Sequence, residues 1–349
     1  MLKRTLYLAW RSLGWASRAA LVAALALAFG FSVLVLVLRY AVLPNADRYR
    51  EPIVATLSQT VGAKVGIGAI EAGWDGARPQ LVLSDVVLYD AAGQPALRLG
   101  RMENSLSWWS LFSGRLQFHT IEITAPDLEV RRDAQGVFYV AGIPLREDAG
   151  EPSMAQWVLE QRRIVVRNAR LEWHDELRQA QPLALDKVHL RLENTGRRHR
   201  FALKASAPSG LAGTLDLRGD LSGGRWDAAS DWSGQVYAEL DYADLGAWRT
   251  WVDYPLQLAQ GVGAVRMWIG FSGAALKEVT ADLRLRDVRA RLGTGLPELD
   301  MPALQGRLAW KVLPGGYELA TEDLSLATRP GVALRPTDFL YRTTAPAGE

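Results

Sequence analysis

The residues of this chain that could carry out chemistry are few and far apart in the sequence. A helical zinc site places two histidines four positions apart. The chain contains no cysteine, which excludes disulfides, thiolate nucleophiles and cysteine-ligated metals. None of the four histidines shows the zinc spacing, and we interpret them as surface residues on strands: His119, His174, His189 and His199. We therefore expect no metal site and no cofactor.

The best polar cluster is Trp173-His174-Asp175-Glu176, which could supply one base and two carboxylates. Adjacent residues of a strand point to opposite faces of a sheet, so we interpret this cluster as a strand end followed by a turn. The glycine pairs Gly66 and Gly68, and Gly261 and Gly263, lack the third glycine of a dinucleotide-binding fingerprint. These patterns predict a protein that is not an enzyme.

Charge is balanced along the chain, with 40 basic and 38 acidic residues and a formal net charge of +2. No basic stripe indicates a nucleic-acid partner and no acidic block indicates a tail, so we expect no nucleic-acid binding. Thirteen tryptophans are many for 349 residues. This excess is typical of β-structure and of membrane interfaces.

The elements that position the rest of the chain begin with an uncharged apolar segment from Ala19 to Leu38. As a helix this segment spans about 30 Å, one hydrocarbon core, and it predicts a transmembrane helix. A cleaved secretory signal is the alternative. However, this apolar segment is longer than the apolar region of a usual signal peptide, and no small-x-small cleavage site follows it. A slight excess of basic residues before the span places residues 1–18 in the cytoplasm or the headgroup layer.

After the span the hydrophobic period changes from that of a helix to that of strands. Residues 39–62 predict a linker and a second helix that covers the end of the sheet and has Asn45 as its N-cap. Residues 63–145 and 163–349 alternate apolar and polar side chains, which is typical of half-exposed strands. Residues 146–162 between them predict a loop and a short helix. Strands that follow each other directly favour an antiparallel meander.

Two local features stand out within the second strand-rich segment. From Val279 to Leu285 the odd-numbered residues are apolar, and at Arg286-Asp287 the alternation moves to the even positions. Such a slip predicts a bulge or a tight turn. A further short helix is predicted over residues 245–252, where Trp248 and Trp251 would pack on an end or edge of the sheet.

A sheet with one apolar face must bury that face against another layer, against itself or against a ligand. The predicted helices are too short to cover so many strands. Either the strands pair face to face in sandwiches, or one sheet curls into a groove whose inner face solvates acyl chains. Alternation does not distinguish a protein core from a lipid-lined groove, but a membrane anchor favours the groove because the bilayer supplies lipid.

Several segments resemble one protein family. Ile67–Trp74 and Pro79–Asp90 resemble the opening of AsmA-like proteins, most closely the YhdP branch. Leu106–Gly114 is similar to the strand and turn that precede the family's next β-unit. Ile121–Asp133 is similar to its recurring unit of apolar strand, proline, apolar strand and Arg-Asp, and Trp157–Phe201 also resembles this branch.

The resemblance implies a mainly β fold: an N-terminal transmembrane helix followed by an elongated, curled antiparallel sheet, a groove or gutter, with a few short helices. It implies a single-pass protein of the bacterial inner membrane, with its N-terminus cytoplasmic and its bulk periplasmic. Its groove would conduct phospholipid toward the outer membrane without catalytic residues or a cofactor. Its expected partners are phospholipid, the inner membrane and other envelope proteins.

Family members of this type are much longer, so we expect the chain to be the N-terminal portion of a longer protein. Ten apolar residues of the strand-rich segments are candidate acyl contacts: Leu81, Leu83, Leu116, Phe118, Ile121, Ile123, Leu128, Val130, Leu283 and Leu285.

Two other functions remain open at this point. The chain could be a scaffold of anchored β-sandwiches that organises envelope assembly without transporting lipid. It could also bind or modify glycans, because exposed tryptophans stack on sugars. A long apolar channel would support lipid transfer, closed sandwiches the scaffold, and a tryptophan-lined polar cleft with converging carboxylates the glycan hypothesis.

Overall fold

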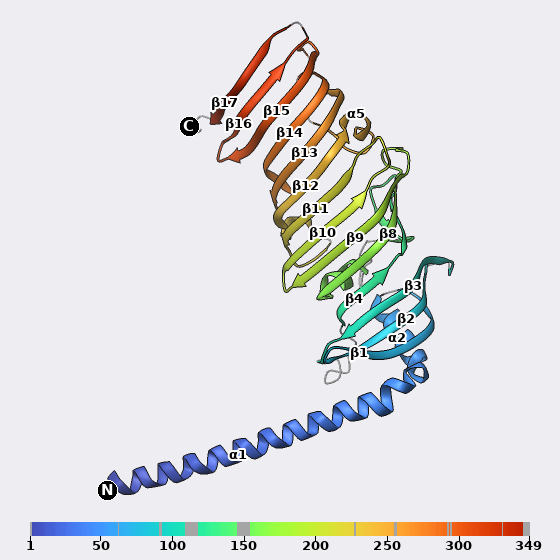
Figure 1. Cartoon of the computed structure of the whole chain (residues 1–349), viewed down its shortest axis with the longest axis vertical. Coiled ribbons are helices and arrows are strands. Elements are labelled where there is room, and N and C mark those ends of the chain that lie inside the picture. The colour runs from blue at the N-terminus through green and yellow to red at the C-terminus, as the bar shows by residue number, and fades with distance from the viewer. Residues whose placement is uncertain are drawn as a thin grey trace.

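The computed structural model describes residues 2–344 except residues 62, 91–92, 109–117, 145–153, 227, 255–256, 292, 294 and 330. A long N-terminal helix leads into one elongated, curled sheet, with a few short helices beside it (Figure 1). The expected fold class is thereby confirmed.

Helix α1 (Leu2–Val37) contains the expected membrane span. Among the described residues one helical stretch, Ser17–Gln59, is long and apolar enough to cross a membrane. Its large apolar side chains are mostly exposed, as lipid-facing side chains would be. Phe31 of α1 contacts Trp108 with ring centroids 5.0 Å apart, so the apolar helix adjoins the foot of the sheet.

The chain bends between the span and the sheet. α1 continues into a π-helical turn η1 (Leu38–Val42), a 3-10 segment η2 (Leu43–Tyr49) and helix α2 (Arg50–Val61). The backbone is kinked at Asn45, whose φ of −111° and ψ of 21° are non-helical, so a new helical segment does follow this residue, but α2 itself begins at Arg50. The side-chain amide of Asn45 donates instead to the carbonyl oxygen of Ala41 at 2.9 Å.

All strands in the described part of the chain belong to a single sheet. Short helical segments that the structure describes beside it are α4 (Met154–Glu160), η3 (Ala229–Asp231) and α5 (Leu245–Trp248). The strands are β1 (Val65–Asp75), β2 (Arg78–Tyr89), β3 (Pro95–Leu106), β4 (Phe118–Thr124), β5 (Asp127–Arg132), β6 (Phe138–Val140), β7 (Ile143–Pro144), β8 (Arg163–Asp175), β9 (Leu183–Thr195), β10 (Arg198–Ser206), β11 (Thr214–Ser222), β12 (Ser233–Asp244), β13 (Gln257–Ser272), β14 (Ala275–Arg291), β15 (Leu299–Leu313), β16 (Gly316–Ala327) and β17 (Ala333–Thr344).

Consecutive strands pair antiparallel from β1 to β4 and from β8 to β17, which confirms the meander over most of the sheet. The junction between these parts differs, because β4 and β5 both run parallel to β8. Pro126 separates β4 from β5 and has no N–H to donate, but its carbonyl accepts from the N–H of Arg170 at 3.0 Å. The chain segment through α4 is long enough to return for a parallel pairing.

In several strands the residues that point to the core change once between odd and even positions. In β14 the buried positions shift from Leu285 to Val288, and Asp287 between them has a φ of 50°. This left-handed residue confirms the slip predicted at Arg286-Asp287. Because a bulge bends its strand and increases the local twist, a series of such slips curls the sheet. Left-handed backbone recurs within other strands at Asp85, Asn168, Lys187 and Asp323.

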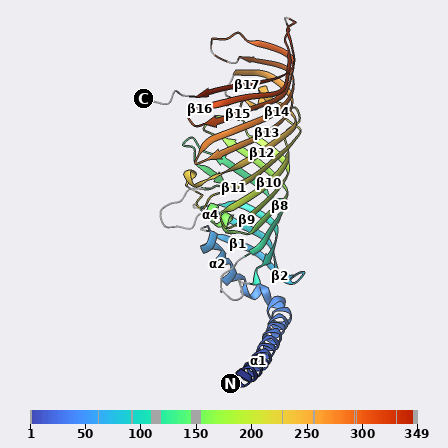
Figure 2. The same cartoon turned by 90° about the vertical axis from the view of Figure 1, so that its left-hand side faces the viewer.

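The inner face of the sheet is defined here as the face that α2 and α4 cover at its N-terminal end (Figure 2). Buried apolar side chains of the protein fill this end. Leu57 of α2 is buried there against the apolar side chains of β1 to β4, β8 and β9. Ile121 and Val188 are each 2% exposed in this main core. A smaller core around Val288 and Met301 lies under the connection that contains α5.

Helix α5 ends at Trp248, earlier than the predicted end at residue 252. Asp244 caps its N-terminus by accepting from the N–H of Ala247 at 3.0 Å. The Trp248 indole packs against the main core and donates to the carbonyl of Leu211 at 3.2 Å. The predicted packing of this tryptophan on the sheet is therefore confirmed.

Candidate functional site: the inner face of the sheet

Apolar side chains on the inner face stand directly opposite one another from strand to strand. Cross-strand neighbours on one face lie close enough for their side chains to touch, so matched apolar pairs form a continuous row. The first inner row comprises Leu192, Phe201, Gly219, Val236, Ile269, Val279, Trp310, Leu319 and Tyr341. The second comprises Leu190, Leu203, Leu217, Ala238, Met267, Ala281, Leu308, Thr321 and Phe339. Gly219 in the first row and Thr321 in the second are the two members without an apolar side chain.

These two inner rows become less covered from the N-terminal to the C-terminal end of the sheet. Leu190, Leu203 and Leu217 are half-buried and pack beside the main core. Further along, Leu308 is 36% exposed and Phe339 is 57% exposed. No second sheet or helix buries this part of the inner face among the described residues. A contiguous apolar face of this kind is typical of a surface that binds another apolar group.

A pocket of about 600 Å³ lies where the inner rows pass beneath α4, and we call it the α4 pocket. Its volume falls within the range of small-molecule sites. Ala155, Val158 and Leu159 of α4 form one wall, and the residues of the sheet form the opposite wall. The sheet contributes Leu190, Leu192, His199, Phe201, Leu221 and Phe271, and the connection from β11 to β12 contributes Trp226, Ala229 and Trp232.

Among the described residues that line the α4 pocket, His199 is the one with an ionisable side chain, and a hydrogen bond to Asn194 holds its ring. The Asn194 side-chain amide donates to the carbonyls of Val158 and Gln161 at 2.9 and 2.6 Å. Its oxygen therefore accepts from Nδ1 of His199 at 2.7 Å. Nε2 lies 3.3 Å from the carbonyl oxygen of Gly223. The ring is thus fixed against the sheet and fastens α4 to it through Asn194.

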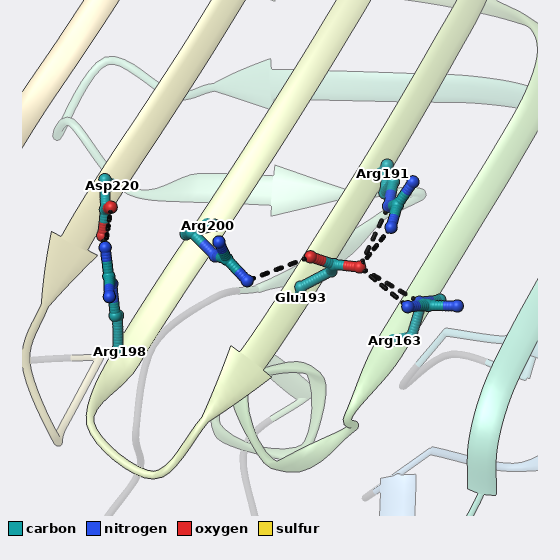
Figure 3. A network of polar contacts seen from close by, with 6 residues as sticks. All are labelled: Arg163, Arg191, Glu193, Arg198, Arg200 and Asp220. Atoms are coloured by element: carbon teal, nitrogen blue, oxygen red, sulfur yellow. Dashed lines mark hydrogen bonds and ion pairs between the residues drawn. The ribbon is translucent and has the colours of Figure 1, made fainter.

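The outer face carries the charged side chains of the same strands (Figure 3). Glu193 accepts from three arginines: Arg191 at 2.5 Å, Arg163 at 3.0 Å and Arg200 at 3.4 Å. Hydrogen bonding from Arg191 is the largest effect that lowers the pKa of Glu193. Further ion pairs between neighbouring strands join Arg198 to Asp220, Lys204 to Asp216, Arg266 to Glu239, and Arg307 to Asp282 and Glu322.

The polar cluster noted in the sequence is structural. β8 ends at Asp175, as the interpretation of a strand end predicts. Asp175 is 3% exposed and accepts from the guanidinium of Arg132, while His174 faces Glu172 at 3.2 Å. Among the described residues no group of three or more histidine, aspartate or glutamate side chains could hold a metal ion.

The described candidate acyl contacts are either buried or half-buried, and their contact with lipid stays a prediction. Leu81, Leu83, Phe118 and Ile121 are buried in the main core, and Leu285 is buried in the smaller one. These five already have protein neighbours on the inner face. Leu116 lies outside the described residues. The half-buried candidates are Ile123, Leu128, Val130 and Leu283.

Sequence reasoning missed the residues that line the exposed part of the face. Trp310 and Leu319 belong to stretches whose alternation is visible, but they were not singled out as contacts. Phe339 and Tyr341 lie on β17, where Pro336 and flanking polar residues obscure the strand pattern. Their cross-strand partners on β16 are the signal that identifies their face.

A protein with one helix long and apolar enough to cross a membrane, followed by one long sheet with a partly open apolar face, is the class that this structure defines. The chain belongs to the YhdP family: the sequence profile described as YhdP protein matches residues 5–347. Membership of this family is consistent with a lipid-transfer role. No curated protein and no solved structure matches the chain.

Proposed function

We propose that this protein transfers lipid, conducting phospholipid along the inner face of its sheet. The observation that carries the proposal is the pair of inner rows, which run from β9 to β17 and lose their protein cover on the way. Each methylene that leaves water for an apolar face contributes about 0.8 kcal/mol. Acyl chains would lie on the rows, while headgroups remain near solvent at the open side of the groove.

The position of the groove relative to a bilayer supports this proposal. The apolar helix contacts the foot of the sheet through Phe31 and Trp108, so the protein-filled end of the sheet adjoins the bilayer and the inner rows lead away from it. We place the anchor in the bacterial inner membrane with residues 1–18 in the cytoplasm, because basic residues favour that side. The sheet then lies in the periplasm and leads phospholipid toward the outer membrane, where other envelope proteins are further expected partners.

The scaffold hypothesis depends on sheets that pair face to face. The strands of the described residues form one sheet instead, so the arrangement on which that hypothesis depends is not found among them. Transfer along a groove involves no bond formation or cleavage, and the proposal therefore requires no cofactor.

Photocrosslinking of the full-length protein in bacterial membranes tests the proposal. A photoreactive phenylalanine derivative replaces Leu308 on the inner face or Lys311 on the outer face of the same strand. We expect phospholipid to be crosslinked by the first variant and not by the second. Equal labelling at both positions, or none at Leu308, would contradict a lipid-conducting inner face.

A further inference from the structure

We propose that the α4 pocket is the inner end of the groove and holds one acyl chain of a phospholipid. This rests on the lipid-conducting function proposed above and adds the place at which a lipid is retained.

The first argument is that the groove ends at this pocket. On the N-terminal side the inner face is occupied by the protein's own side chains, with Ile164, Val166 and Val188 all buried in the main core. On the C-terminal side the inner rows continue without a cover to β17. An acyl chain that lies on the rows can therefore extend toward the membrane as far as α4 and no further.

The second argument is the chemistry of the lining. Leu192 and Phe201, which begin the first inner row, also line the pocket, so the row and the pocket are continuous. Nδ1 of His199 donates to the side-chain oxygen of Asn194, and its ring lies 5.1 Å from that of Trp232. The other described side chains of the lining are aliphatic or aromatic, so the lining suits a hydrocarbon chain rather than a headgroup.

The third argument concerns the glycines of the pocket floor. The ring of Phe201 occupies the place where a Cβ of Gly219 would stand, and the indole of Trp232 does the same at Gly223. Both rings can therefore lie flat on the sheet rather than stand up into the pocket. A side chain at either glycine would push an aromatic ring into the space that we assign to the acyl chain.

The fourth argument is that α4 closes the pocket and is fastened in place. It is a short helix that would not be stable alone, and Asn194 binds its carbonyl at Val158 and the following carbonyl at Gln161. Gln156 of α4 also donates to the carbonyl of Gly224 at 3.5 Å. A short helix held by a few such hydrogen bonds can retain a chain beneath it and still move enough to release it. We expect α4 to act as such a strap.

The test uses the full-length protein with the photoreactive residue in place of Trp226, which lines the pocket and is 43% exposed. Crosslinked phospholipid is measured with and without Ala155→Trp, which fills the pocket from α4. Ala247→Trp on the exposed face of α5 is the matched control. If filling the pocket removes the contacts of two methylenes, we expect labelling at Trp226 to fall about tenfold. Ala155→Trp should leave labelling at Leu308 unchanged. The control, Ala247→Trp, should leave labelling at Trp226 unchanged.

The outcomes separate this proposal from the function on which it rests. Labelling at Leu308 but not at Trp226, or labelling at Trp226 that Ala155→Trp leaves unchanged, would overturn the pocket and leave lipid conduction standing. No labelling at either position would overturn both. Ala229→Trp, which enters the same pocket from the connection between β11 and β12, replaces Ala155→Trp if that variant does not fold.

Discussion

Single residues set how closely neighbouring strands of this sheet approach each other. Gly263 of β13 has a φ of 153°, and a Cβ there would collide with the backbone carbonyl of Arg284 on β14. We expect Gly263→Ala to lower the free energy of unfolding by about 2 kcal/mol, because neither backbone can move without breaking the ladder. Thermal unfolding in detergent measures the effect.

The control for this substitution is Gly100→Ala. Gly100 lies on β3 with ordinary strand backbone and open space around its Cβ position. Alanine there should leave the melting temperature unchanged or raise it slightly, because alanine has less conformational freedom to lose. Similar destabilisation at both positions would show that the close approach at Gly263 is not the cause.

The outer face offers a second test with a single side chain. Asp216 is 7% exposed and lies 2.8 Å from Arg218 and 3.3 Å from Lys204. Hydrogen bonding from Arg218 is the largest effect that lowers the pKa of Asp216 in the folded protein. A lowered folded pKa means that Asp216 contributes stability above the unfolded pKa of about 3.9, and that this contribution is lost as pH falls through the folded value.

We therefore expect Asp216→Asn to lower the free energy of unfolding by about 1 kcal/mol at pH 7. The two proteins should converge as the pH falls below the ordinary range of aspartate, and melting temperature measured against pH shows the convergence. A constant difference across the whole pH range would mean that the loss at neutral pH is steric rather than electrostatic.

At the scale of elements, the attachment of α4 to the sheet depends on Asn194. Replacement by alanine removes the donors to Val158 and Gln161 and leaves Nδ1 of His199 without its acceptor. We expect Asn194→Ala to lower stability by about 1–3 kcal/mol and to speed hydrogen exchange in α4 more than in β9. Gln94→Ala on an exposed turn is the control. Unchanged exchange in α4 would contradict its attachment through Asn194.

The sequence predicts some elements of this fold much better than others. The bulge at Asp287 was predictable because apolar residues change from odd to even positions there, and the same change is visible around Asp85, between Leu83 and Val86. The parallel pairing of β4 and β5 with β8 was not predictable from local patterns. It depends on which strand edge the returning chain meets, and alternation is the same for both directions of pairing.

The candidate site could likewise be predicted only in part from local sequence patterns. The period of two correctly identifies residues that share a face, but it does not say what covers that face. Ile121 and Leu308 lie in equally clear strand patterns, yet the first is 2% exposed under α2 and α4 and the second is 36% exposed. Only the position of the short helices separates the filled part of the inner face from the open part.

The whole molecule is asymmetric across its sheet, with inner apolar rows and an outer face of ion pairs. This asymmetry allows two neighbouring residues of one strand to serve as a matched pair. Val279 and Thr280 are both half-buried on β14, and they point to opposite faces. Val279 stands between Ile269 and Trp310 in the first inner row, so a carboxylate there would interrupt the row at its middle.

We expect Val279→Glu to lower the phospholipid crosslinked by a photoreactive residue at Phe339 at least about tenfold, because an ionised carboxylate is poorly tolerated beside acyl chains without a partner. Thr280→Glu adds the same charge to the outer face and should leave labelling at Phe339 unchanged. Labelling at Trp226 should persist in both variants, because the α4 pocket lies on the membrane side of the interruption. Loss of labelling at Trp226 together with Phe339 would mean that lipid reaches the pocket from the open end of the sheet, and equal labelling in both variants would show that lipid does not follow the inner rows.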